Sequence, residues 1–418
     1  MFAFLRTQLR ATADILKGLR GNARACIVTE PGWAIPYHLY ITYASLYMVA
    51  LGCSERQVGT VTAVGLASAM VFSLIAGYIT DKLGRRKTTL IFDLVGWSLP
   101  ALIWAVAQGY VFFVVAAVIN SVVRVVYISW NCLFIEDTEP AQRVHAYSWI
   151  FVASILAGFI TPFAGLLVRK FTLVPTMRGL YLFATVCMTS MFLIRNKVTR
   201  ETQMGLKKMM VTKDMRLLAS VRDYLQAVRE CVRDPVVLVA MSMAIVSNIL
   251  LTLRTTFLPI LLAGDLGFRA ADIAIFPALY SGMMLLVYVF IMPSINGGNM
   301  RAALMYGLLF SIVGYALLIV SPQKSYALVI TSTIVVAIGT GISGPVIESV
   351  LANSIRSDDR AKVMSVFHAC MFAVSSPFGY LAGVLSSVSD RLPFAMAVVL
   401  LGAAVGLLRR LSTLQRAR

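Results

Sequence analysis

Two arginines lie deep inside stretches of sequence that are otherwise apolar, and no other residues in this chain raise a sharper chemical question. Arg124 stands about fourteen residues into the run 110–135, and Arg254 stands about eighteen into the run 236–262. A charge at the centre of a bilayer costs at least about 2.5 kcal/mol, so each arginine calls for a reason. Because a guanidinium grips carboxylate or phosphate through paired hydrogen bonds, and no acid lies at matching depth, the two arginines predict an anionic guest.

Further polar residues at similar depth could complete such a binding site. His38, in the middle of the run 26–51, adds a donor that titrates near neutral pH. The alternative is that each arginine has a structural partner, Asn120 or Tyr127 for Arg124, and Asn248 or a backbone carbonyl for Arg254. The expected binding residues are Arg124, Arg254, His38, Tyr127 and Asn248.

Three carboxylates within apolar runs are candidates for carrying a proton. Glu30 and Asp93 lie near the starts of their runs, and Glu348 lies near the end of the run 325–352. Glu348 follows a stretch rich in glycine and proline, which loosens a helix and could expose the carboxylate alternately to either side. The alternative, which we favour for Asp93, is that the acids join ion pairs at a gate.

A turn at 77–87, Gly-Tyr-Ile-Thr-Asp-Lys-Leu-Gly-Arg-Arg-Lys, sets a cluster of charges between two apolar runs. Its glycines permit a tight bend, and Arg85 can reach acids at the end of the run 110–135. Such a cluster would act as a latch that forms in one conformation and breaks in another, or would simply anchor the chain by its positive charge. The expected latch residues are Gly77, Asp81, Gly84, Arg85, Arg86, Glu136 and Asp137.

The elements that must position these residues are membrane-spanning helices. Apolar residues make up 59% of the 418 and charged residues only 13%, against about 25% in globular proteins. A bilayer core needs about 20 apolar residues per helix. The sequence offers twelve such runs, at 26–51, 57–80, 88–107, 110–135, 144–168, 178–195, 236–262, 270–293, 301–320, 325–352, 361–386 and 392–408.

Charge placement predicts how the chain is oriented. Most of the 37 lysines and arginines lie on the side shared by both termini, so we expect both termini in the cytoplasm and the protein in the cell (plasma or inner) membrane. The net charge of +18 then reflects topology and attraction to anionic lipids, with no need for a nucleic-acid partner. Residues 1–25 are expected to form an amphipathic surface helix.

The two halves of the sequence align with each other. An offset of 215 places Arg86 on Arg301, and Arg143 falls on Arg360 two residues further on. We therefore expect an all-α membrane protein with twelve transmembrane helices, arranged as two six-helix halves related by pseudo-twofold symmetry. The predicted division is 26–195 and 236–418 for the bundles, joined by a cytoplasmic linker with an amphipathic helix at 196–235. Duplicated halves favour a transporter, with its site between them.

The turn at 77–87 also carries a family resemblance. Its Gly77, Asp81, Lys82 and Gly84, followed by Arg85-Arg86-Lys87, match the pattern GxxxD(R/K)xGRR(K/R), so the sequence resembles the major facilitator superfamily of secondary transporters over nearly its whole length. The resemblance implies that the first, fourth, seventh and tenth helices line a central cavity. The superfamily's drug/proton antiporter motif in the fourth helix is similar here only at Arg124. Arg254 is similar to a seventh-helix arginine of the arm that carries organic anions and phosphate esters.

The predicted function is secondary active transport of a small organic solute by alternating access, coupled to protons, with an organic anion or anionic amphiphile as the favoured cargo. Multidrug efflux by drug/proton antiport is the second hypothesis, and a non-transporting membrane scaffold or sensor is the third. No metal-ligand spacing, phosphate-binding loop or catalytic set is present in the sequence, so we expect neither an enzyme nor a cofactor. The expected partners are a small-molecule substrate, protons and membrane lipids.

Overall fold

The computed structural model describes residues 20–212, 235–295, 298–354 and 360–416, and this part of the chain is helical, without strands. Eleven of its helical stretches are long and apolar enough to cross a membrane. They coincide within a few residues with eleven of the twelve predicted runs. The exception is the stretch Val152–Phe171, which begins eight residues after the start of the predicted run 144–168. The prediction of an all-helical membrane fold is confirmed.

The first half of the chain contains the helices of the first six predicted runs and one additional helix, α13. Its helices are α2 (Gly21–Thr29), α3 (Pro31–Ile41), α4 (Ala44–Ala50), α5 (Glu55–Leu83), α6 (Arg85–Asp93), α7 (Leu99–Ala105), α8 (Tyr110–Asn120), α9 (Val123–Ile135), α10 (Pro140–Gly158), α11 (Thr161–Phe171), α12 (Leu173–Val198) and α13 (Gln203–Thr212). Helix α13 begins the predicted linker. The surface helix expected within 1–25 falls mostly on 1–19, and most of the amphipathic linker segment falls on 213–234; both lie outside the described residues.

The second half supplies the remaining six runs. Its helices are α15 (Pro235–Thr252), α16 (Leu258–Ala263), α17 (Ala270–Ile273), α18 (Ile275–Leu286), α19 (Met300–Val320), α20 (Tyr326–Ser354), α21 (Arg360–Ser386) and α22 (Leu392–Arg416). A π-helical turn joins α15 to α16 at Leu253–Phe257, and a π-helical turn followed by a 3-10 turn, Val287–Ser294, continues α18.

Proline explains why several runs are not single regular helices. The first run is divided among α2, α3 and α4, with Pro31 at the start of α3 and Pro36 inside it, so no one piece reaches the length of a span. A proline donates no hydrogen bond to the carbonyl four residues before it. Pro100 follows the π-helical turn Leu94–Ser98 in the third run, and Pro259 follows the turn that contains Arg254. Such local widening of a helix is frequent at functional sites.

The side-chain amide of Asn120 shows how one of these interruptions is satisfied. Pro100 leaves the carbonyl of Gly96 without its helical donor, and Asn120 Nδ2 donates to that oxygen at 2.7 Å. An unpaired carbonyl buried in the bundle would cost free energy, so this bond stabilises the irregular third helix. No hydrogen bond joins the Oδ1 atom of Asn120 to Arg124 among the described residues, so Asn120 is not the partner considered for that arginine.

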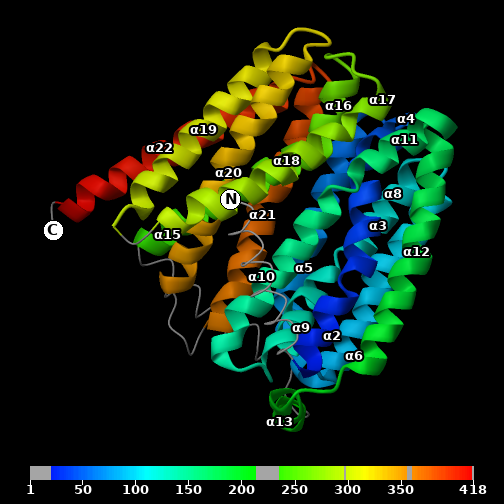
Figure 1. The fold of residues 1–418 in the computed structure, drawn as a ribbon, viewed down its shortest axis with the longest axis vertical. Coiled ribbons are helices and arrows are strands. Elements are labelled where there is room, and N and C mark those ends of the chain that lie inside the picture. Colours follow the sequence, from blue (N-terminus) through cyan, green and yellow to red (C-terminus); the bar gives the residue numbers. More distant parts are fainter. Residues whose placement is uncertain (1–19, 213–234, 296–297, 355–359, 417–418) are drawn as a thin grey trace, which may run out of the picture.

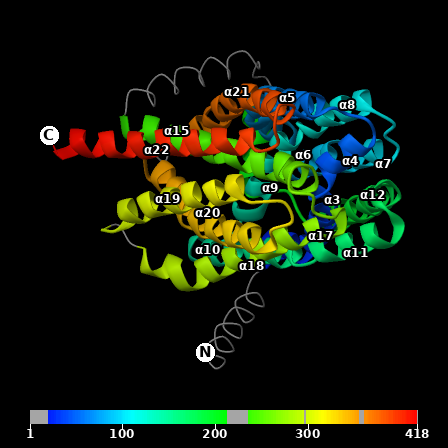
Figure 2. The same cartoon turned by 90° about the horizontal axis from the view of Figure 1, so that it is seen from above.

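The two halves form two groups of helices that lie side by side (Figures 1 and 2). Helix α5 of the first half packs along α21 of the second, and α10 and α11 pack against α17 and α18. We name the two ends of the bundle by their residues. The charged-turn end comprises 84–86, 136–137 and 199–203, and the far end comprises 51–54, 264–269, 321–325 and 387–391. Away from the far end, α15, α19 and α22 diverge from α2, α6 and α12 (Figure 1).

Close backbone approach holds the halves together toward the far end. A Cβ atom on Gly59 of α5 would lie 2.6 Å from the Cα atom of Gly383 in α21, so neither position has room for a side chain. Nearby, Ser376 Oγ donates to the carbonyl of Ala63 at 2.8 Å, and Tyr43 Oη donates to the carbonyl of Ala270 at 2.8 Å. Small residues of this kind allow helices to pack closely where apolar burial gives no driving force.

We predict that Gly59→Ala lowers the midpoint of thermal unfolding of the purified protein. Its methyl group would meet backbone atoms of α21, and overpacking of this kind costs about 1–3 kcal/mol. Gly402→Ala on α22 is the matched control, because a Cβ atom there meets no atom within 4 Å. Alanine is the better helix former, so the control should keep or raise the midpoint. Equal midpoints for the two variants would contradict the assignment of Gly59 to the contact.

Candidate functional site

The functional site we consider is a group of adjoining cavities between and within the two halves. Three of them have volumes of about 310, 350 and 340 Å³, and Tyr37 of α3 lines all three. Arg254 lines the first, and Arg124 lines the other two. The two arginines singled out in the sequence therefore line neighbouring cavities that share Tyr37, one arginine from each half of the protein.

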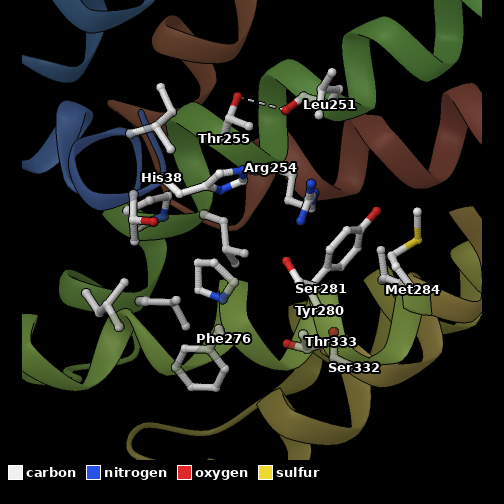
Figure 3. A pocket seen from close by; sticks show the side chains of 18 of the residues that line it. His38, Leu251, Arg254, Thr255, Phe276, Tyr280, Ser281, Met284, Ser332 and Thr333 are labelled. Atoms are coloured by element: carbon white, nitrogen blue, oxygen red, sulfur yellow. Dashed lines mark hydrogen bonds between the residues drawn. The ribbon is translucent and has the colours of Figure 1, made fainter. Parts of the chain in front are cut away.

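Arg254 projects from its π-helical turn into the first cavity, where Figure 3 shows it beside Tyr280, with His38 on the other side. The centre of its guanidinium lies 3.5 Å from the centroid of the Tyr280 ring. Among the described residues no carboxylate forms an ion pair with Arg254, and none of the hydrogen bonds in this part of the chain uses its guanidinium. Attraction between a guanidinium and the face of an aromatic ring uses none of the N–H groups in a hydrogen bond with an acceptor, so these groups remain able to bind an anion.

Arg124 on α9 is held in the same manner, but by a ring from the other half. The centre of its guanidinium lies 4.6 Å from the centroid of Phe372 on α21. Its Nε atom is buried and finds no acceptor among the residues that the structure describes. A buried donor without an acceptor costs free energy, commonly about 1–3 kcal/mol. An anion bound at Arg124 would supply the missing acceptor.

Of the other three expected binding residues, His38 and Tyr127 line the cavities and Asn248 does not. His38 lines the cavity of Arg254, and Tyr127 lines one of the cavities of Arg124. Tyr127 is 50% exposed, and its ring lies 5.6 Å from that of His368 on α21. Asn248 lines none of the cavities described above, and its Nδ2 atom donates to Ser375 Oγ at 3.0 Å. It is thus bound to α21 rather than to Arg254.

Two of the three expected proton-carrying acids come together, with a cation that sequence reasoning missed. Asp93 forms a buried ion pair with Arg195 of α12, and Glu30 is buried beside them in the same cavity as Arg124. Arg195 ends the predicted run 178–195, where a basic residue suggests only a membrane boundary. Glu348 is exposed and does not join this group. The group holds two carboxylates and one guanidinium, of which only Asp93 and Arg195 form an ion pair, so it is neutral only when it holds one proton.

The charged turn forms a compact ion cluster. Arg85 is 3% exposed and forms ion pairs with Asp81 at 2.8 Å and Glu136 at 3.1 Å. Glu201, which the sequence analysis did not single out, accepts hydrogen bonds from the backbone N–H groups of Arg85 and Arg86, both at 2.9 Å. A carboxylate at the positive N-terminus of α6 is stabilising.

The rest of the expected latch residues surround this cluster. Arg86 donates to the carbonyl of Asn196 at 2.6 and 2.9 Å, and Asp137 accepts from the N–H of Gln203 at 3.3 Å. Gly77 lies in α5, and Gly84 ends that helix with φ of 85°. A Cβ atom on Gly84 would lie 2.7 Å from Glu201 Oε2, so glycine is needed there. Each of these partners belongs to the first half or the start of the linker. That the cluster acts as a latch, which breaks in another conformation, remains a prediction.

The fold and the central cavities define a multi-pass membrane protein of the transporter class. The model of the Major Facilitator Superfamily matches residues 33–379, so the chain belongs to this superfamily. A relative, the uncharacterised MFS-type transporter YqjV of Bacillus subtilis (strain 168), is 29% identical over 129 residues. That alignment covers 30% of this chain and 31% of the relative, so only about a third of the relative's length is matched.

Solved transporter structures share the fold. A mutant of the nucleoside transporter NupG superposes with a TM-score of 0.70 at 14% identity, over 94% of this chain and 99% of that one. The POT family transporter PepTSo gives 0.71 at 12% identity, over 95% and 98%. The human organic anion transporter MFSD10 (TETRAN) gives 0.64 at 14%, over 93% and 100%. At such identities the likeness is one of fold.

The buried ion pair yields a prediction about stability. Asp93→Asn removes the carboxylate that forms the ion pair with Arg195 and leaves Glu30 as the nearest acid, and breaking a buried pair costs about 3–5 kcal/mol. We therefore expect a markedly lower thermal midpoint for Asp93→Asn, with partial recovery in the double variant Asp93→Asn/Arg195→Met, which removes both charges. Asp272→Asn is the control, since its hydrogen bond with Tyr326 is exposed. If Asp93→Asn had the same thermal midpoint as Asp272→Asn, the ion pair would not stabilise the fold.

Proposed function

We propose that this protein is a secondary active transporter that moves a small organic anion, or an amphiphile bearing an anionic group, by alternating access. The observation that carries the proposal is the pair Arg124 and Arg254. Both line central cavities, both have an aromatic ring on the face of the guanidinium, and neither has a carboxylate partner among the described residues. An anionic cargo supplies the acceptor that each guanidinium lacks.

The location of the arginines suits a transport cycle. Arg124 belongs to the first half and Arg254 to the second, so one cargo in the shared space would be bound by both halves. Contacts between α5 and α21 close the far end, while α15 and α22 diverge from α2 and α6 toward the charged-turn end (Figure 1). Rocking of the halves about the bound cargo would exchange these two states. The charge distribution of the sequence favours the cytoplasm for the charged-turn end, with both termini on that side.

Proton coupling is proposed at Glu30, with Asp93 and Arg195 as its neighbours. One guanidinium neutralises one carboxylate, so a proton on Glu30 removes the remaining charge from a buried group. Glu30 lines the same cavity as Arg124, which lets cargo and proton influence each other electrostatically. Glu348, exposed at the end of α20, is the second proposed proton carrier.

Multidrug efflux by drug/proton antiport is the competing function, and one observation favours it. The aromatic side chains of Trp33, Tyr37 and Trp97 line the cavity that also holds Glu30, and such surfaces suit flat lipophilic cations. The two arginines oppose this function because they would repel a cation. Our proposal for the charge of the cargo therefore depends on the arginines of this chain, and not on the cargo of any transporter that shares its fold.

The first test concerns cargo charge. We expect anionic compounds to raise the thermal midpoint of the purified protein more than matched neutral or cationic ones, and Arg254→Ala to abolish most of that shift. Arg254→Lys keeps the charge but loses the planar pair of donors, so an intermediate shift is expected. Arg56→Ala, at an exposed position at the far end, is the control. Stabilisation by cations alone, or an undiminished anion shift in Arg254→Ala, would refute the anion proposal.

The second test concerns coupling. In proteoliposomes loaded with an anion that passes the first test, Glu30→Gln should abolish accumulation driven by a pH gradient while preserving exchange of cargo for cargo, because the amide cannot release a proton. Glu139→Gln, an exposed acid at the start of α10, is the control. Gradient-driven accumulation at the wild-type level in Glu30→Gln would remove Glu30 from the coupling mechanism.

A further inference from the structure

At the far end, acidic residues from the two halves meet at the place where α5 and α21 pack most closely. Glu55 is the first residue of α5, and the capping residues Ser54 and Gln57 fix this helix start through mutual hydrogen bonds of 2.9 and 3.3 Å. The Gly59–Gly383 contact lies one turn further along α5. Glu55 is therefore held rigidly against the second half.

The partner acid is Asp390, in the connection between α21 and α22. Its Oδ1 accepts a hydrogen bond from Ser386 Oγ at 3.0 Å, and its Oδ2 accepts one from the N–H of Asp265 at 3.3 Å. A Cβ atom on Gly383 would lie 2.8 Å from the carbonyl oxygen of Glu55, and Ser386, which binds Asp390, lies about one turn further along α21. The two acids therefore meet on the same stretch of α21, where their carboxyl groups can share a proton. Glu55 Oε2 is buried and receives no hydrogen bond from the described residues.

The basic residue nearest to Asp390 in the sequence is engaged elsewhere. Arg391, next to Asp390 in the sequence, approaches Asp265 at 3.6 Å and donates to the carbonyls of Ile319 and Ser321 at 2.7 and 2.9 Å. Among the described residues, no lysine or arginine forms an ion pair with Glu55 or Asp390. Asp265 also accepts from Ser389 Oγ at 3.4 Å. Other charged groups of this end are Arg56, exposed beside Glu55 in the sequence, and Arg269, Asp272 and Lys324 near the starts of α17 and α20. Arg169 and Lys170 end α11, and Arg178, near the start of α12, donates to the carbonyl of Ala107 at 3.2 Å.

We propose that Glu55 and Asp390 share a proton when the halves are closed at the far end, and that loss of this proton opens that end. With the proton in place, one carboxyl donates to the other and the two halves are joined by a short neutral contact. Without it, two negative charges face each other across the contact, which disfavours closure. This proton switch is separate from the proposed cargo and would apply to any solute that uses the central cavities.

The pKa of Asp390 is raised, which is the direction that the proposal requires. Burial raises the pKa of the Asp390 carboxyl above its ordinary value, and the negative charge of Asp265 acts in the same direction. The hydrogen bonds that Asp390 makes with Ser386, with the Asp265 N–H and with Glu55 act against burial and lower this pKa. A state in which a carboxyl has a raised pKa binds more protons than a state in which the acid is solvated. The closed far end is therefore favoured at low pH and loses stability as pH rises.

The experiment measures the separation of the two halves directly. Spin labels are placed at Val111 on α8 and Val388 after α21, both exposed, in a full-length protein whose native cysteines are replaced by serine. Distance distributions are recorded without cargo between about pH 4.5 and 8.5. We expect a short distance at low pH and a longer one that gains weight as pH rises, at most about tenfold per pH unit for one shared proton.

Glu55→Gln separates the proposal from a general effect of pH. The amide of glutamine can donate to Asp390 without titrating, so this variant should keep the short distance throughout the pH range. Glu139→Gln, at the charged-turn end, should behave like its parent. A pH-independent distribution in the parent, or an unchanged pH response in Glu55→Gln, would overturn the proposal. No cargo is present in this experiment, so neither result bears on the proposed anion site at the arginines. Failure of the proton switch is therefore distinguishable from failure of the anion proposal.

Discussion

The interior of this protein is organised around two positive charges that its own acids do not neutralise within the described residues. Arg124 and Arg254 are fixed by aromatic rings, Phe372 and Tyr280, which stabilise a guanidinium without using its hydrogen-bond donors. An arginine paired with a carboxylate would already be satisfied and would attract a cargo weakly. Stacking instead keeps the donors available while reducing the cost of burial. The proposed preference for anions and the central location of the site both depend on this arrangement.

Three acids of the first half, unlike the two central arginines, form ion pairs. Arg195 holds Asp93, and Arg85 holds Asp81 and Glu136, so these ion pairs are local to the first half. Glu30 is left in excess beside a pair that is already neutral. In the proposed mechanism, the uncompensated positive charge of the arginines would bind the anion, and the uncompensated negative charge of Glu30 would bind the proton.

Two glycines, Gly59 and Gly383, determine how closely the two halves approach at the far end. At the Gly59–Gly383 contact the backbones of the two halves approach so closely that the far end closes without large apolar side chains. The proposed proton switch, the Glu55–Asp390 pair, lies one turn away along α5, so its protonation would act directly on this contact between the halves.

The sequence by itself determined the class of this protein. Apolar runs of the length of a bilayer, separated by short charged turns, permit little besides a helical bundle in a membrane, because every backbone group must be satisfied within its own helix. The pattern at 77–87 then indicated the superfamily, and the depth of Arg124 and Arg254 in their runs marked both as unusual without any structural information.

Only the tertiary structure decided which polar groups meet. Asn120 and Asn248 were plausible partners for the arginines, yet Asn120 serves a carbonyl that Pro100 leaves free, and Asn248 binds Ser375. Arg195, Glu201 and the Glu55–Asp390 pair gave no signal, because each meets residues far away in the sequence. Periodicity fixes how deep a residue lies in its own helix, whereas its partner depends on how neighbouring helices are rotated and packed, and that depends on the whole bundle.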